Sequence, residues 1–503
     1  MATRIRIDGS RLSLTDVERI ADGAPCVLSA SAVKLVRESR RVVEHAIAGG
    51  GQVYGVNTGF GHLSNVGIAD KDLDALQRNL IRSHCAGVGD PLPQRTVRAI
   101  LALRANCLVR GHSGLRVETV RRLLDYLNKG IHPVVPEKGS VGASGDLAPL
   151  AHIAVTLIGE GEVFLEGKRM PTARALKRVG LQPLALKAKE GLALINGTQV
   201  MSGIGILALL QARRLTIAAD AIGAMTLEAL LGSHRAFDKR LHDARPQKGQ
   251  RESAANLRRL LRKSELVKTH IDCGKVQDCY SLRCIPQVHG AVRDGLDYVQ
   301  QVLAIEVNSS TDNPMVFIDQ DEMVSGGNFH GQPVSLALDH LGTSVCSLAT
   351  ISERRIERLL NPALSDLPAF LAKDPGLHSG FMMAHVTAAA LVSENKVLAH
   401  PASVDTVPTS AGKEDHVSMG AHAARKAATI VEHVATVLAI EWQCAAQALH
   451  HRRPHRAGVG VEAARDCLRR IGVKLVKEDR ALSGDIETAR DALLSGELVK
   501  TLK

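Results

Sequence analysis

Aromatic side chains are scarce in this chain of 503 residues, which has seven Phe, four Tyr and one Trp. Leu, Ala, Val and Ile must therefore fill the interior, and aliphatic interiors suit packed helices better than a β-sandwich. Apolar residues make up 45% of the sequence, which is enough for one extended helical body or for two or three consecutive domains. The composition predicts a mainly helical protein.

The sequence also lacks paired cysteines and long apolar runs. Its nine cysteines include no CxxC pair, which argues against a disulfide framework and against a structural zinc site. The N-terminal segment up to Gly23 has no apolar stretch of signal-peptide length, and no run approaches the roughly 20 apolar residues of a membrane span. We expect a cytoplasmic protein with no metal and no membrane partner.

Negative charge is in short supply, and the formal net charge is +11. Such a surplus is compatible with a nucleic-acid binder or a catalytically silent scaffold. The basic residues are nevertheless dispersed, except in HHRRPHR at 450–456, and that cluster has almost no aromatic side chains for base stacking. We interpret the cluster as a solvated helix end and expect no nucleic-acid partner.

Several long segments have the apolar spacing of helices. Leu338, Leu341, Val345 and Leu348 recur at intervals of three and four, which places them on one helix face. The predicted helices lie within 90–110, 206–231, 288–307, 334–360, 383–398 and 427–450, and only GEVFLEGKRMP at 161–171 has clear strand signals. We predict a smaller mixed region at 1–110 and a helical body at 111–503.

Between the helices lie polar, glycine-rich segments that packing does not require, and the most informative is GSVGASGDLAPLAH at 139–152. Its glycines permit tight bends with positive φ, and Asp146 stands where an N-cap would start an apolar helix. Ser144 therefore precedes a helix N-terminus, whose partial positive charge stabilises a developing anion. The simplest interpretation of this segment is a glycine-rich turn followed by a capped helix. A phosphate cradle is a weaker alternative, because the GxxxxGK[ST] lysine and the GxGxxG spacing are missing.

The order Ala143-Ser144-Gly145 allows a further interpretation. In a tight bend the Gly145 amide nitrogen can attack the Ala143 carbonyl, since glycine has no Cβ to block the approach. Loss of two waters, the second carrying away the Ser144 hydroxyl, would leave a five-membered ring with an exocyclic methylene. Such a ring is an electrophile made from the chain itself.

Around this tripeptide the sequence resembles the histidine and aromatic-amino-acid ammonia-lyase family, whose prosthetic group is 4-methylideneimidazole-5-one. The matching motifs follow the family's order from about Tyr54 to Gly420: YGVNTGFG, GSVGASGDLAPL, INGTQ, QDCYSLRC, TDNP, GGNFHGQP, LNPALSDLP and SVDTVPTSAGKEDHVSM. The resemblance implies a fold dominated by α-helices, the long-helix bundle of the fumarase and aspartase superfamily. It also implies no dissociable cofactor, and a homotetramer whose active sites draw residues from more than one subunit.

The resemblance further implies roles for single residues. Tyr54 matches the family's usual base for the β-proton, although it could merely orient the substrate, and its pKa, ~10 for a free phenol, would have to be lowered. Arg283 matches the residue that holds the substrate carboxylate, which suits a planar guanidinium. The remaining matches bind the electrophile or the substrate, or pack beside them: Asn196, Gln277, Tyr280 and Phe329.

The choice of amino acid rests on His84, in the pair Ser83-His84, and on Glu414. Both match family members that use histidine. A carboxylate can accept a hydrogen bond from an imidazole, whereas the same carboxylate facing a phenyl ring would be buried without compensation. We therefore favour elimination of ammonia from L-histidine to give trans-urocanate. The alternatives with the same electrophile are a phenylalanine or tyrosine ammonia-lyase, a lyase of a modified histidine, and a 2,3-aminomutase.

Four positions depart from the pattern of histidine-specific members. Gly412 and Lys413 replace an asparagine and a glutamine before Glu414, and His378 and His385 replace amides. Lys413 either pairs with Glu414, which would weaken its contact with an imidazole, or points to solvent.

Overall fold

The computed structural model describes residues 4–49, 53–270, 274 and 276–502, and the chain divides into two compact units. The first unit comprises Met1–Leu207, Gln300–Asp339 and Pro401–Arg425, and the second comprises Ala208–Val299, His340–His400 and Lys426–Lys503. The division expected at residues 110 and 111 falls inside the first unit. Both units are discontinuous in sequence, because the chain passes back and forth between them.

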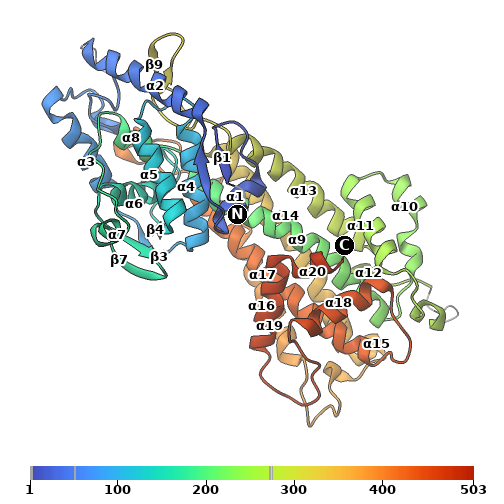
Figure 1. Ribbon diagram of the computed structural model, residues 1–503. Coiled ribbons are helices and arrows are strands. Elements are labelled where there is room, and N and C mark those ends of the chain that lie inside the picture. The colour runs from blue at the N-terminus through green and yellow to red at the C-terminus, as the bar shows by residue number, and fades with distance from the viewer. Residues whose placement is uncertain (1–3, 50–52, 271–273, 275, 503) are drawn as a thin grey trace. The chain divides into compact units, whose positions relative to one another are not determined.

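Four long helices, which Figure 1 labels, have residues in both units by their residue numbers. They are α9 (Gln199–Ala229), α13 (Ile285–Glu306), α14 (Gln332–Leu360) and α17 (Gly420–His450). They confirm the helices predicted at 206–231, 288–307, 334–360 and 427–450. By length and composition α9 and α14 could cross a membrane, yet most of each apolar window is buried in the described part of the chain. They are core helices of a soluble protein.

The first unit contains every strand of the described residues. Its other elements are β1 (Ile5–Ile7), α1 (Leu14–Ala21), β2 (Cys26–Leu28), α2 (Ala30–Ala48), α3 (Leu73–His84), β3 (Val88–Pro91), α4 (Gln94–Leu108), α5 (Val117–Lys129), β4 (Ile131–Pro133), β5 (Pro136–Lys138), α6 (Leu147–Leu157), β6 (Glu162–Leu165), β7 (Lys168–Pro171), α7 (Thr172–Arg178), α8 (Glu190–Ile195), β8 (Met315–Phe317) and β9 (Glu322–Val324). Strands β1 and β2 pair in parallel; β3–β5, β4–β6–β7 and β8–β9 pair antiparallel. The predicted strand segment 161–171 is the β6–β7 hairpin, and the mixed structure extends beyond residue 110.

The core of the first unit is built around α4, which packs against α1 and α5, and around α6, which packs against α3 and α8. Nearly every side chain of α4 from Val97 onward is buried, including the charged Arg104. Its guanidinium donates to Oε1 of Gln199 at 2.5 Å and to the carbonyl of Ala193. A buried cation requires such acceptors, and these two lie beside α8 and the start of α9. This contact holds the segment that carries Asn196.

The second unit is entirely helical in the part that the structure describes, and buried polar groups tie its long helices together. Its other helices are α10 (Lys239–Ala244), α11 (Lys248–Leu260), α12 (Tyr280–Arg283), α15 (Pro362–Ser365), α16 (Met382–Leu398), α18 (Val459–Arg470), α19 (Ser483–Ser495) and α20 (Glu497–Thr501). Glu441 on α17 is fully buried and accepts hydrogen bonds from Arg355 on α14 and Thr226 on α9, at 2.6 Å in each case. Asp220 on α9 accepts from Arg293 on α13 at 2.8 Å. Buried carboxylates are tolerated only with such partners, so these contacts set the register of the helices.

The basic cluster at 450–456 begins at His450, the last residue of α17. All of its residues except Arg452 are exposed. The interpretation as a solvated helix end is confirmed. Arg452 is half-buried because its guanidinium donates to the carbonyls of Ala229 and Ser365.

Candidate active site

Segments far apart in the sequence line one cavity of about 860 Å³ in the first unit. This volume lies in the usual range for small-molecule sites. Seven of the predicted site residues line it: Tyr54, His84, Ala143, Ser144, Asn196, Phe329 and Glu414. Gly145, the eighth, is buried next to Ser144. Residues of α3, α8 and several loops thus meet at the tripeptide.

The tripeptide lies in a tight bend that only glycine permits at two positions. Gly145 has φ +74°, and a Cβ there would lie 2.3 Å from the carbonyl oxygen of Gly197. Gly142 has φ +72°, and a Cβ there would lie 2.2 Å from Oγ of Ser418. The Asp146 N–H donates to the Gly197 carbonyl at 2.7 Å. Neighbouring atoms therefore approach the backbone closely at both glycines, and they hold the tripeptide in the tight bend that the predicted cyclisation requires.

Asp146 occupies the predicted N-cap position of α6, but its side chain does not cap that helix. Its Oδ2 instead accepts from the backbone N–H groups of Val200 at 3.0 Å and Met201 at 2.9 Å, in the first turn of α9. The expectation of a local cap was wrong in this respect, because the carboxylate meets the free N–H groups of a helix that is distant in sequence. Complete burial raises the pKa of Asp146 to about 7, although these hydrogen bonds oppose the shift.

Ser144 makes two contacts that connect the tripeptide to other segments. Its carbonyl accepts from Nδ2 of Asn196 at 2.8 Å, and its Oγ donates to Oε1 of Glu414 at 2.9 Å. Oδ1 of Asn196 is buried and has no hydrogen-bond partner among the described residues. The tight bend, the amide donor on the Ser144 carbonyl and this unused acceptor fit a prosthetic group formed from the tripeptide.

Tyr54 and His84 face the same cavity with opposite pKa shifts. Burial raises the pKa of Tyr54, the N–H of Gly61 donates to its hydroxyl at 3.4 Å, and the nearby Glu414 carboxylate raises its pKa further. Burial lowers the pKa of His84, although a hydrogen bond to Leu80 and the charge of Glu414 oppose the shift. Nδ1 of His84 lies 2.8 Å from the Leu80 carbonyl, which can only accept, so Nδ1 carries the proton and Nε2 is left as an acceptor.

Gln277, Tyr280 and Arg283 belong to the second unit and are not among the residues that line the cavity. Tyr280 is 71% exposed, and the Arg283 guanidinium lies 4.7 Å from the centre of its ring. Nε of Arg283 is buried and has no hydrogen-bond partner in the described part of the chain. Their predicted roles stay predictions.

The four residues that depart from the expected pattern have different surroundings. Gly412 has φ +79°, a conformation that glycine and asparagine both tolerate. Lys413 is exposed, lines the cavity, and makes no ion pair with Glu414 among the described residues. His385 lies 2.8 Å from the carboxylate of Glu353; burial acts to raise the pKa of that carboxylate, but His385 and Arg354 hold it at about 2. His378 lies 3.8 Å from Asp479.

Sequence reasoning missed several polar residues that line the cavity. His330 and His416 stack with ring centres 5.8 Å apart and planes 6° apart, and both border the cavity. His330 directly follows the predicted Phe329, and His416 lies two positions after the predicted Glu414. Both belong to matching motifs, so the motifs themselves were the available signal. The other missed polar residues are Thr58, Ser64, Asn65, Asn313, Ser325, Ser410 and Asp415.

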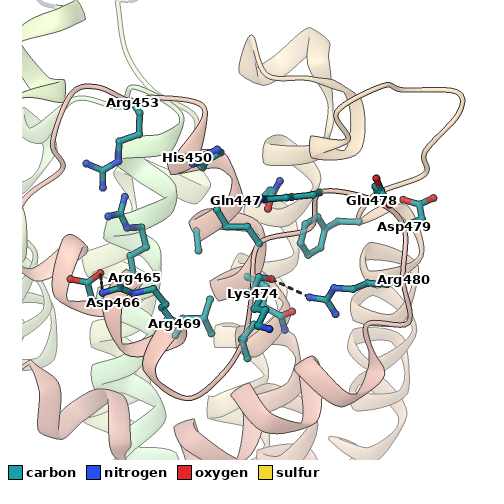
Figure 2. Close-up of a pocket in the computed structure, with 17 residues that line it drawn as sticks. Gln447, His450, Arg453, Arg465, Asp466, Arg469, Lys474, Glu478, Asp479 and Arg480 are labelled. Carbon is teal, nitrogen blue, oxygen red and sulfur yellow. Dashed lines mark hydrogen bonds and ion pairs between the residues drawn. The ribbon is translucent and has the colours of Figure 1, made fainter.

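A second cavity, of about 930 Å³, lies in the second unit and contains no predicted site residue (Figure 2). Basic side chains gather there, but several are paired within the chain. Arg453 and Arg465 share the carboxylate of Glu462 at 2.9 Å, and Arg480 pairs with Asp485 at 2.5 Å. The tripeptide and its polar partners therefore mark the first cavity as the candidate active site.

Comparisons with known proteins show the family of the chain. A model of the aromatic amino acid lyase family matches residues 12–470. Histidine ammonia-lyase from Myxococcus xanthus is 55% identical over 501 residues, covering 99% of this chain and 98% of that protein. The structure of histidine ammonia-lyase from Trypanosoma cruzi matches with a TM-score of 0.92 at 44% identity, over 99% of this chain and 95% of that chain. Tyrosine aminomutase from Streptomyces globisporus matches with a TM-score of 0.94 at 40% identity, over 99% and 98%. The prediction of a fold dominated by α-helices is confirmed, and the chain has the fold of solved ammonia-lyase structures.

Proposed function

The chain belongs to the aromatic amino acid lyase family, and we propose that its cavity eliminates ammonia from L-histidine to give trans-urocanate. It is a carbon–nitrogen lyase. Curated histidine ammonia-lyases are 50–56% identical to it over nearly the whole chain, and this similarity supports the choice of histidine. The cytoplasm is the proposed compartment.

One contact carries the proposal: Oε1 of Glu414 accepts the hydrogen bond from Oγ of Ser144 at 2.9 Å. It places a carboxylate, which can accept from an imidazole N–H, directly beside the residue that forms the electrophile. His84 lines the same cavity with Nε2 available as an acceptor. A cavity that offers a charged acceptor and an imidazole acceptor favours a ring with N–H donors over a phenyl ring.

4-Methylideneimidazole-5-one, formed from Ala143, Ser144 and Gly145, supplies the electrophile that activates the amino group for departure. Asn196 would hold it through the Ser144 carbonyl, and Phe329 would pack beside it. Glu414 and His84 orient the imidazole ring of the substrate, and the cavity walls limit access of water to the reacting carbon.

Tyr54 takes the β-proton in this proposal. Burial and the Glu414 carboxylate raise its pKa. The phenol of Tyr54 is therefore protonated when no substrate is bound. A positive charge entering the cavity, such as the substrate ammonium, acts in the opposite direction and favours the phenolate. The binding of substrate is therefore what prepares Tyr54 to act as a base.

The substrate carboxylate is held by Arg283 of a second copy of the chain, within a homotetramer, and Gln277 and Tyr280 come from the same copy. Two observations support this part of the proposal. Tyr280 is 71% exposed, and the Arg283 guanidinium above its ring has a buried Nε without a partner among the described residues. A planar guanidinium is well suited to bind a carboxylate through two parallel hydrogen bonds.

Incubation with L-histidine, L-phenylalanine and L-tyrosine tests the function. We expect ammonia and the ultraviolet absorbance of urocanate from L-histidine, and much slower reactions with the other two. The similarity to a tyrosine aminomutase favours a 2,3-amino shift as the second candidate, which would convert L-tyrosine into a β-amino acid with little release of ammonia. That product, or no unsaturated acid from L-histidine, would contradict the proposal.

A further inference from the structure

The loop before Glu414 is a closed hairpin. The N–H of Thr409 donates to the carbonyl of Glu414 at 2.9 Å, and the N–H of Glu414 donates to the carbonyl of Thr409 at 3.3 Å. Between them Ser410, Ala411 and Gly412 all have positive φ, at 52°, 53° and 79°. Non-glycine residues keep this conformation only where the surrounding contacts hold it. The hairpin therefore fixes the backbone at Glu414.

The Thr409 side chain also fixes the Glu414 carboxylate. Its Oγ1 donates to Oε2 of Glu414 at 2.7 Å, while Oε1 receives the hydrogen bond from Ser144. The two carboxylate oxygens thus have different partners, and only Oε1 is directed at the tripeptide. A hydrogen bond to a charged acceptor is short and directional, so the Thr409 hydroxyl prevents the carboxylate from rotating.

The same hairpin touches the turn that holds Tyr54. Its tip, Ser410–Gly412, packs against Gly61–Leu63, and a Cβ on Gly61 would lie 2.4 Å from Oγ of Ser410. The N–H of Gly61 donates to the Tyr54 hydroxyl. The hairpin therefore links the position of Glu414 to that of Tyr54.

Lys413 carries a positive charge next to Glu414 in the sequence. It precedes Glu414, lines the cavity, and makes no ion pair with Glu414 in the described part of the chain. A carboxylate freed from Thr409 would be able to turn toward this ammonium group and away from the tripeptide.

We propose that Thr409 is a positioning residue: its hydroxyl holds Oε2 of Glu414 so that Oε1 faces Ser144 and the ring of the substrate, rather than Lys413. This inference rests on the proposed function of the cavity and adds the residue that sets the direction of its carboxylate.

Thr409→Val, which keeps the shape of the side chain and removes the hydroxyl, tests the proposal in the full-length protein. We expect kcat/KM for L-histidine to fall about 10- to 100-fold, the size of one charge-assisted hydrogen bond. Thr409→Ser keeps the hydroxyl and should restore most of the activity. In a Glu414→Gln background Thr409→Val should cause little further loss, because the two residues act through one contact.

Thr406→Val is the matched control. Its hydroxyl lies three positions earlier in the same segment and accepts from the N–H of Val417 at 2.9 Å, without touching Glu414. We expect kcat/KM within about threefold of the wild-type value. An equal loss in Thr406→Val, failure of Thr409→Ser to restore activity, or additive losses in the double variant would overturn the proposal.

A second measurement does not depend on activity. The mass of the peptide that contains Ser144 shows whether two waters have been lost, and Thr409→Val should lose them as the wild type does. A peptide of unchanged mass would overturn the proposal, since the hydroxyl would then act on formation of the electrophile. The proposed function fails separately if the wild-type protein does not convert L-histidine, whereas Thr409 is judged by the ratio of variant to wild type on whichever amino acid is converted.

Discussion

Ser144 and Glu414 are 270 residues apart in sequence, and the hydroxyl of one donates to the carboxylate of the other at 2.9 Å. The residue proposed to form the electrophile and the residue proposed to select the substrate are therefore direct neighbours. Glu414 also raises the pKa of Tyr54 and opposes the lowered pKa of His84. A change at Glu414 therefore acts on the Ser144 hydroxyl, the Tyr54 phenol and the His84 imidazole.

Ser144→Ala should abolish elimination and leave the fold intact, because the hydroxyl is needed for the second loss of water. Ammonia release and the circular dichroism melting curve measure the two effects. Ser64→Ala is the control, since it removes a serine hydroxyl that lines the same cavity but does not belong to the tripeptide, and its variant should keep most of the activity. Wild-type rates in Ser144→Ala would refute the electrophile.

Glu414→Gln should lower kcat/KM for L-histidine about 10- to 100-fold, because a neutral amide accepts a weaker hydrogen bond from an imidazole than a carboxylate does. Steady-state kinetics with L-histidine and L-phenylalanine measure the change, and the preference for L-histidine should shrink. Asp415→Asn removes an adjacent carboxylate that also borders the cavity, and it should have little effect. Equal losses in both variants would show that net charge, and not the contact of Glu414, matters.

Gly145→Ala should prevent formation of the electrophile, because its Cβ would lie 2.3 Å from the Gly197 carbonyl oxygen. Gly167→Ala is a close control: Gly167 has φ +75° and no atom within 4 Å of an added Cβ. Both variants carry the backbone cost of about 1–2 kcal/mol for alanine at positive φ, but only Gly145→Ala meets a steric clash. The peptide mass should show two lost waters in Gly167→Ala and none in Gly145→Ala. Two lost waters in both would mean that the bend tolerates a side chain.

Asp146 should contribute a fall in the free energy of unfolding as the pH rises from about 4 to about 7. The pKa of Asp146 is raised from 3.8 to about 7, so the folded chain binds a proton over this interval that the unfolded chain has already released. Its contribution to stability is complete below the ordinary pKa and is lost as the pH passes the folded value. Asp146→Asn keeps the acceptor for the N–H groups of Val200 and Met201 and cannot titrate.

Denaturant unfolding at several pH values measures this effect. Between about pH 4 and about pH 7 the wild type should lose more stability, or gain less, than Asp146→Asn. Buried Glu306, whose pKa burial raises, and His132, whose pKa burial lowers to about 4, contribute changes of opposite sign in both proteins alike. Identical slopes in the two proteins would show that Asp146 does not titrate in this interval.

Part of the fold was predictable from local spacing. The helices at 206–231, 288–307, 334–360, 383–398 and 427–450 were expected from apolar periodicity and are present as α9, α13, α14, α16 and α17, because helix periodicity depends on neighbours three and four positions away. The starts of α9 and α17 were placed about seven residues too late. The first turn of α17 carries small and polar residues, and in that of α9 the polar Gln199 and Ser202 flank Val200 and Met201. The burial of these turns depends on distant segments.

The site was predictable in its composition and only partly in its geometry. Motifs identified Tyr54, His84, Ser144, Asn196 and Glu414, which the structure brings to one cavity. The target of the Asp146 carboxylate, the direction of the Tyr54 pKa shift and the hydrogen bond from Thr409 were not predictable, because each depends on groups brought close only by folding.

The sequence by itself determined the long helices, the glycines that a tight bend needs and the set of polar residues that we propose for the reaction. These follow from local chemistry: helix periodicity, the absence of a Cβ, and the donors and acceptors of each side chain. Only the tertiary structure decided which groups meet, since burial, charge and hydrogen bonding act between segments hundreds of residues apart. The contact between Ser144 and Glu414 is of this kind, and the direction of that carboxylate depends on Thr409.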